Sequence, residues 1–245
     1  MPLEEAARYE NYHLQETCII YNITLLEARK SGLAPICLVL ERVALTDLAS
    51  SDLDAIYPKP NPRVLAKAWS SIDKHAQKFI GMSPFCVIAT TGADGSADAS
   101  PRGGNPGFTH VEGPNLLLMP DRAGNNRLDS FRNIVEGSGF VHLLFFVPGI
   151  DEVLRINGKG AVTTDPVLLK RMIEFGKEPR AVLRIEVKET YFHCGKAAMR
   201  SKLWSDETRV KRSSFPSIGE INHDRTSLGE PESQAVVETI YKEQL

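Results

Sequence analysis

The chain has 245 residues, of which 42% are hydrophobic and 24% charged, as in ordinary globular proteins. Its 29 Lys and Arg residues against 31 Asp and Glu residues give a net charge of −2 at pH 7. A protein that coats nucleic acid or an anionic membrane by bulk charge needs a basic excess, so this balance argues against both partners. The length suits one large domain, or one domain with an extension.

The cysteine and histidine residues favour neither disulfides nor a metal site. The six histidines do not cluster as ligands, and the cysteines form no CxxC pair, so we expect reduced thiols and no metal. No apolar run approaches the roughly 18–20 residues of a membrane span, and the early acids of the N-terminus are unlike a signal peptide. We therefore expect a cytoplasmic protein. The four cysteines are Cys18, Cys37, Cys86 and Cys194.

Three prolines within residues 57–62 divide the chain, because they continue neither a helix nor a central strand. Residues 1–56 carry apolar clusters without a catalytic pattern, and we interpret them as an N-terminal extension with one or two helices. Residues 57–245 form the main domain. Apolar residues at three- and four-residue steps predict one amphipathic helix from Pro62 to Gly81, since Pro62 suits its first turn and Gly81 its C-terminal cap.

The next 110 residues are mostly expected to be strands. The run Phe85–Thr91, a Gly-Ala-Asp-Gly turn and residues 96–101 predict a β-hairpin. Residues 180–193 alternate between apolar and charged side chains, which is typical of a strand with one buried face. Several antiparallel strands with few helices predict a mainly β fold, a closed or nearly closed barrel. The remaining elements are strands at 115–119, 139–147 and 153–163 and short helices at 126–136, 166–176 and 196–204.

Two loops that follow strands, residues 100–108 and 119–128, are rich in Gly, Asn and Arg. The sequence has no GxSxG, Walker, GxGxxG or HExxH motif, so these loops carry the best functional signal. A Gly/Asn loop that leads into a helix presents unpaired backbone N–H groups, which suit a phosphate dianion. Arg122 and Arg127 flank this position, and Arg102 is within reach. The alternative is that the arginines are solvated and the glycines only make turns.

A third segment, residues 193–204, follows the last predicted strand. Lys196 and Arg200 are four residues apart and share one face of a helix. The alternative is a surface helix with Leu203 and Trp204 in the core. We expect Cys194 to be a small buried residue and His142, inside an apolar strand, to be a hydrogen-bonded structural residue.

A series of motifs in order resembles the FMN-dependent flavoproteins of the pyridoxamine 5'-phosphate oxidase-like split-barrel superfamily. The resemblance covers roughly residues 54–245 and includes the Ser-Phe-Pro-Ser sequence at 214–217. The clearest motifs are Ser100-Pro101-Arg102-Gly103, Pro120-Asp121-Arg122, Arg155-Ile156-Asn157-Gly158 and Tyr191-Phe192-His193-Cys194.

The resemblance implies a six-stranded antiparallel split β-barrel and a homodimer with FMN between the subunits. Where the family has an acid, this chain has Gly104 and Asn105, and where a second cation is expected it has Asn126. Lys196 and Arg200 would approach the FMN cleft, from the partner chain. The other implied FMN contacts are Ser100, Arg102, Met119, Pro120, Arg122, Gly124, Asn125, Asn126 and Arg127.

The activity implied by the resemblance is that of an FMN-dependent oxidoreductase acting on a small molecule. Flavin N5 would accept a hydride, and oxygen or another acceptor would reoxidise the flavin. The Arg-x-His pattern of true pyridoxamine phosphate oxidases is not evident near the C-terminus, and no catalytic base stands out. Two alternatives remain: a non-catalytic flavin- or tetrapyrrole-binding module on the same barrel, and an interaction protein with an empty cleft.

Overall fold

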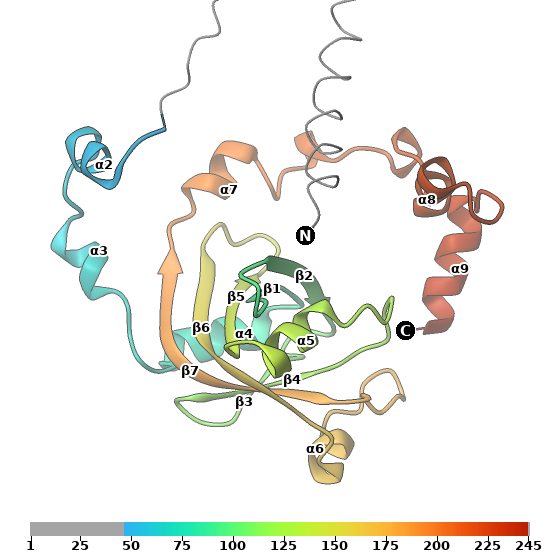
Figure 1. Ribbon diagram of the computed structural model, residues 1–245, viewed down its shortest axis with the longest axis horizontal. Helices are drawn as coiled ribbons and strands as arrows, with labels where there is room; N and C mark the ends of the chain where they lie inside the picture. Colours follow the sequence, from blue (N-terminus) through green and yellow to red (C-terminus); the bar gives the residue numbers. More distant parts are fainter. Residues whose placement is uncertain (1–46, 245) are drawn as a thin grey trace, which may run out of the picture. The chain divides into compact units, whose positions relative to one another are not determined.

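The structure, a computed structural model, describes residues 47–244 (Figure 1). Its contacts divide the chain into two compact units between Lys59 and Pro60. In the described part of the first unit, helix α2 spans Ser50–Ile56. The apolar clusters that we expected to form helices before residue 47 lie outside the described residues. The domain limits 1–56 and 57–245 stay a prediction.

The second unit is built on one antiparallel sheet with the strand order β2-β1-β5-β6-β7-β4-β3. The mainly β, split-barrel fold is confirmed, with seven strands instead of six because the two-residue β3 adds one. The strands are β1 (Phe85–Thr91), β2 (Ala97–Gly103), β3 (His110–Val111), β4 (Leu116–Pro120), β5 (Phe140–Phe146), β6 (Val153–Thr163) and β7 (Val182–His193).

The strands lie close to their predicted positions because alternation and turn residues define them locally. β1 and β2 form the expected hairpin, in which Gly95 has a φ of 85° that suits glycine. In β7, Leu183 and Ile185 are buried while Arg184 and Glu186 are exposed, as the alternation predicts.

Short helices lie around the sheet, and among the described helices none has the length and apolar character to cross a bilayer. α5, α6 and α7 are all shorter than their predicted ranges. The helices of the second unit are α3 (Pro62–Ala66), α4 (Lys74–Met82), α5 (Asp129–Glu136), α6 (Pro166–Arg171), α7 (Lys196–Ser201), α8 (Ile218–Thr226) and α9 (Gln234–Gln244), with 3₁₀ turns at Asp206–Thr208 and Arg212–Ser214.

The single helix predicted from Pro62 to Gly81 is wrong, since residues 67–73 separate α3 from α4. Trp69 exchanges two backbone hydrogen bonds with Thr190 of β7, at 3.0 and 2.7 Å, which a helical backbone does not allow. The side chain of Asp73 then caps α4 by accepting from the N–H groups of His75 and Ala76. A long-range strand contact and a local cap thus override the helical periodicity.

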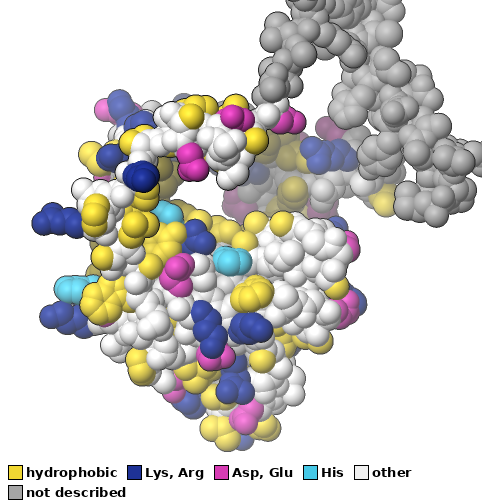
Figure 2. All heavy atoms as spheres, turned by 60° about the vertical axis from the view of Figure 1, so that its left-hand side comes forward, with side chains coloured by type: hydrophobic (Ala, Val, Ile, Leu, Met, Phe, Trp, Pro, Cys, Tyr) yellow, Lys and Arg dark blue, Asp and Glu magenta, His cyan; other side chains and the backbone are white. Residues whose placement is uncertain are grey.

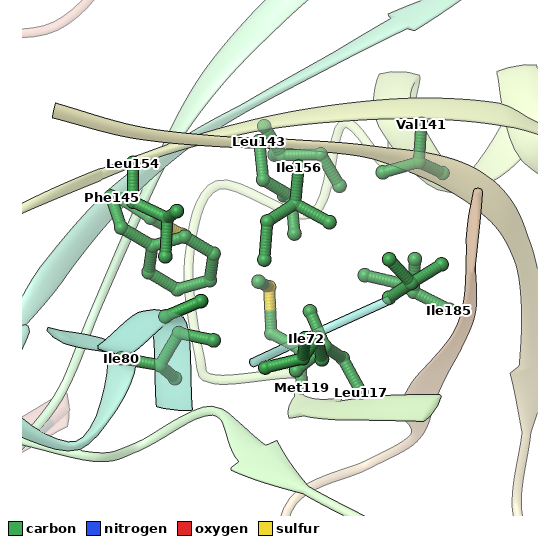
Figure 3. Close-up of a cluster of buried hydrophobic side chains, with 14 of the residues drawn as sticks. Ile72, Ile80, Leu117, Met119, Val141, Leu143, Phe145, Leu154, Ile156 and Ile185 are labelled. Atoms are coloured by element: carbon green, nitrogen blue, oxygen red, sulfur yellow. The ribbon is translucent and has the colours of Figure 1, made fainter. Parts of the chain in front are cut away.

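The hydrophobic core fills the inside of the curved sheet and is closed by α4 (Figure 3). Ile80 of α4, Leu117 and Met119 of β4 and Ile156 of β6 are almost completely buried. Figure 3 shows these side chains pointing toward one another from different elements. Burial of such side chains, worth about 1.5–3 kcal/mol each, holds the strands in the curve that brings the candidate site together.

Candidate functional site

The curvature of the sheet brings together the two loops that the sequence singled out. β2 and β4 stand far apart in the strand order, yet Arg102 of β2 lies close enough to lower the pKa of Asp121, which follows β4. Glu174, from the segment after α6, joins them: its carboxylate accepts from the Asn105 N–H at 2.6 Å and from Arg122 at 3.0 Å.

Asp121 stands among three arginines. Burial raises the pKa of its carboxyl, and the charges of Arg102, Arg180 and Arg122 lower it without fully compensating. The Asp121 N–H donates to the Ala181 carbonyl at 2.9 Å, which places Asp121 beside Arg180. The charge here is therefore net basic.

Arg180 is a basic residue of the site that the sequence reasoning missed. Its guanidinium donates to the side-chain oxygen of Asn126 at 2.9 Å. It comes close because β4 pairs with β7 in a register that sets Pro120 opposite Val182. The one signal available in the sequence was its position at the start of a predicted strand, which does not say what lies beside it.

Arg122 is held in place by the protein itself. Besides Glu174, its guanidinium donates to the Met172 carbonyl at 2.8 Å, and its buried Nε has no hydrogen-bond partner among the described residues. A pocket of about 180 Å³ opens beside this ion pair, lined also by Asn105, Phe108 and His110. Arg122 is thus a fixed, partly neutralised charge at the edge of the site.

The loop between β4 and α5 has open backbone donors, that is, N–H groups without a hydrogen-bond acceptor in the described chain. Within the described chain, the N–H groups of residues 123–126 have no hydrogen-bond acceptor, and a Cβ at Gly124 would meet no atom within 4 Å. α5 begins at Asp129, three residues later than predicted, with an acid in its first turn. The open donors therefore belong to the loop rather than to the helix N-terminus.

The other residues of this loop and of β2 that the resemblance implies as FMN contacts differ in their exposure and in their hydrogen-bond partners. Arg127 is 72% exposed and forms an ion pair with Asp129 at 2.7 Å. Arg102 is half-buried and donates to the Ser100 hydroxyl at 2.5 Å. Met119 and Pro120 are buried. Met119 can therefore contact a ligand only through its backbone.

Lys196 and Arg200 do not join this group within one chain. Both are exposed on α7, four residues apart as predicted, and among the described residues no hydrogen bond or ion pair links them to the loop after β4. Their approach to a cleft from a partner chain stays a prediction.

Gly104 stands where the family has an acidic residue, and this difference has a steric reason. A Cβ at this position would lie 2.7 Å from the Phe108 Cβ and 2.8 Å from a carboxylate oxygen of Glu174. Glycine fits here chiefly because the Phe108 Cβ lies so close to the backbone, and the Glu174 carboxylate approaches it as well. An acid is thus present beside Gly104 and Asn105, supplied by a distant segment.

These residues fit the phosphate end of FMN. Among the described residues Arg102 and Arg180 form no ion pair. Arg180 bonds to Asn126 of the loop, and Arg102 lies near Asp121, where the loop begins. Charged donors together with unpaired backbone N–H groups are the set that a phosphate dianion requires.

Other predictions near the site have different outcomes. Cys194 is exposed, so its expected burial is wrong. His142 is hydrogen-bonded to the Asn157 side-chain oxygen at 2.8 Å, in line with a structural role. Leu203 is 48% exposed, whereas Trp204 is half-buried and donates to the Ile150 carbonyl at 2.9 Å.

A family model described as "Pyridoxamine 5'-phosphate oxidase" matches residues 72–194, from the segment before α4 to the end of β7. The chain belongs to this family. The match includes every strand of the sheet and both loops of the candidate site. No curated protein matches the chain.

Among solved structures, HupZ from Group A Streptococcus is 16% identical, with a TM-score of 0.41 over 49% of this chain and 93% of that one. A putative pyridoxamine 5'-phosphate oxidase from Lactobacillus delbrueckii is 21% identical, with a TM-score of 0.40 over 50% and 95%. An F420 reductase is 18% identical, with a TM-score of 0.35 over 48% and 94%. The likeness is one of fold.

Proposed function

We propose that this protein binds FMN and is an FMN-dependent oxidoreductase that acts on a small molecule in the cytoplasm. The observation that carries the proposal is that Arg102 and Arg180 lie beside Asp121, at the start of a loop whose residues 123–126 have open N–H groups. Membership of the pyridoxamine 5'-phosphate oxidase family supports the same reading.

In this proposal the chain's own residues position the cofactor. The loop N–H groups and Arg102 bind the phosphate, and each charge-assisted bond contributes about 1.5–3 kcal/mol. Arg180 holds Asn126, which shapes the loop, and the Arg122–Glu174 pair fixes the end of β4. Bound FMN supplies a hydride acceptor and passes electrons to oxygen or another acceptor.

The proposal includes a homodimer, with Lys196 and Arg200 of each chain directed to the partner's cofactor. Both side chains are exposed on α7 and make no ion pair among the described residues, so they are available to an anion. Alanine at either position is expected to weaken FMN retention in the dimer.

The first experiment is the visible spectrum of the purified protein, with the cofactor released by heat and identified by mass. We expect FMN, and we expect Arg102→Ala and Arg180→Ala to lower FMN affinity at least tenfold. Arg209→Ala is the control, because Arg209 is 79% exposed and pairs with Asp206, and among the described residues no hydrogen bond or ion pair links it to these loops. A colourless protein that takes up no added FMN would overturn the proposal.

A second experiment separates an enzyme from a binding module. The loaded protein is mixed anaerobically with NADH, NADPH or a reduced deazaflavin, and bleaching of the flavin spectrum is followed, then its recovery in air. We expect reduction and reoxidation with at least one donor. FMN that stays oxidised with every donor would instead support the non-catalytic binding module.

A further inference from the structure

The pocket beside the Arg122–Glu174 ion pair is the size of a single aromatic ring. Its volume is about 180 Å³, and residues 105–108 and 172–174 form its walls together with His110 of β3 and Arg122. A protein cavity of about 150 Å³ is large enough to hold a benzene molecule. The pocket therefore has room for a one-ring compound and for little more.

The rim of the pocket is rigid. The Glu174 carboxylate accepts from Arg122 and from the Asn105 N–H, and the Glu174 backbone exchanges two hydrogen bonds with Lys177, at 3.2 and 2.9 Å. The turn between Glu174 and Lys177 places Phe175 at a φ of 52°, which is costly for a bulky residue and persists only where surrounding contacts fix the chain. A preformed pocket of this kind loses little affinity to the ordering of its own residues.

The charges that border the pocket cancel. Arg122 and Glu174 are half-buried and paired with each other, and the other lining residues carry no formal charge at pH 7. An anion in the pocket is repelled by the Glu174 carboxylate and a cation by the Arg122 guanidinium, so neither gains from entering. An uncharged ligand avoids both the repulsion and the cost of removing a charge from water.

The walls are largely apolar. Phe108 and Met172 are buried side chains that line the pocket, and Ile173, which is 53% exposed, lines it as well. An aromatic ring in contact with these three side chains removes apolar surface from water, which is favourable by about 25 cal/mol per Å².

Unused polar groups accompany these walls. The Nη1 group of Arg122 makes only a long hydrogen bond, 3.4 Å to the Lys177 carbonyl, and so keeps a donor for a ligand. Within the described chain, the side chains of Asn105 and His110 make no hydrogen bond, and both line the pocket. A ring that carries a carbonyl oxygen satisfies such donors without bringing a charge.

The protein surface also lacks a strong preference for one sign of charge. Figure 2 shows one face of the molecule, on which Lys and Arg side chains lie close to Asp and Glu side chains. The net charge of the whole chain is −2. Long-range attraction of a charged ligand needs a field of one sign, so selection falls to the contacts inside the pocket.

We propose that this pocket binds an uncharged, single-ring compound with a carbonyl oxygen, and that this is the substrate class of the protein. The ring packs against Phe108, Met172 and Ile173, and the oxygen accepts from the polar groups of the rim. Naming the ligand a substrate rests on the proposed function, whereas the binding itself does not.

The test is an NMR titration of the full-length protein, with whatever cofactor it carries, with benzamide. The signals of the His110 ring are followed, because a bound aromatic ring shifts protons that lie beside it. Benzoate and benzylamine carry the same ring with a negative and a positive charge. We expect a saturable shift with benzamide and an affinity at least tenfold higher than for either ion.

Two variants test the rim and the wall separately. Glu174→Gln removes the negative charge and leaves Arg122 unneutralised, so we expect benzoate affinity to rise at least fivefold, a gain that a damaged fold does not produce. Ile173→Ala removes an exposed part of the wall and should weaken benzamide binding at least threefold, which tests the pocket if Glu174→Gln fails to fold. Val167→Ala, at a position of α6 that is 66% exposed, is the matched control and should leave the titration unchanged.

The FMN content of the same samples, measured by the visible spectrum, separates this proposal from the proposed function. Arg102 does not line the pocket, so Arg102→Ala should lower FMN affinity and leave benzamide binding unchanged. A protein that contains FMN but shows no saturable shift of His110, or that binds the two ions as tightly as benzamide, would overturn the inference alone. A colourless protein that takes up no FMN and binds benzamide would contradict the oxidoreductase and support the pocket.

Discussion

The guanidinium of Arg122 lies 3.0 Å from the carboxylate of Glu174, 52 residues further along the chain. The two side chains are only 23% and 12% exposed. Because Glu174 also accepts from the Asn105 N–H, one carboxylate connects the loop after β2, the end of β4 and the segment after α6. It holds the rim of the candidate site in place and neutralises one of its arginines.

Glu174→Gln is expected to keep the shape of this contact and remove its charge. Hydrogen bonds to charged groups contribute about 1.5–3 kcal/mol, so we expect the free energy of unfolding to fall by up to that amount in urea denaturation. Glu207→Gln, at an exposed pair with Lys202, should change it little. An unchanged unfolding midpoint for Glu174→Gln would contradict the structural role of the pair.

Asp121→Asn is expected to raise the melting temperature at neutral pH. Burial raises the carboxyl pKa in the folded chain, so the folded state binds the proton more tightly than the unfolded one, and stability falls as pH rises through that raised value. The gain from the variant should therefore be largest above the raised pKa. It should disappear below the ordinary aspartate pKa of about 3.9, as thermal melts across pH would show. A gain independent of pH would point to another cause.

The two cysteines of the described chain should differ sharply in reactivity. Burial raises the pKa of the Cys86 thiol to about 12, whereas Cys194 is exposed. Because the thiolate is the reactive form, iodoacetamide at pH 8 should label Cys194 and leave Cys86 untouched until the protein is unfolded. Peptide mass mapping reads both sites in one experiment. Early labelling of Cys86 would mean that the barrel opens readily.

Leu143→Ala is expected to destabilise the barrel by about 2–5 kcal/mol, because it leaves a cavity among fully buried side chains. The midpoint of chemical denaturation measures the loss. Val135→Ala, at a position that is 70% exposed, is the matched control and should cost much less. Equal losses at both positions would argue against the position of the core.

Local pattern was enough to predict most of the strands. β1, β6 and β7 follow from alternating or apolar runs between turn residues, and Gly95 marks the hairpin because its φ is positive. The helix over 62–81 could not be predicted correctly, since the bonds between Trp69 and Thr190 join positions that are distant in the sequence.

The sequence by itself determined the fold class and pointed to the loops around Arg102 and Arg122, because turn residues, alternation and family motifs are local. Only the tertiary structure decided that Arg180 joins those loops and that Glu174 neutralises Arg122. It also decided that Lys67 meets Arg155 over Tyr191. These relationships depend on strand register and on how far the sheet curves, and both are set by long-range packing of the core.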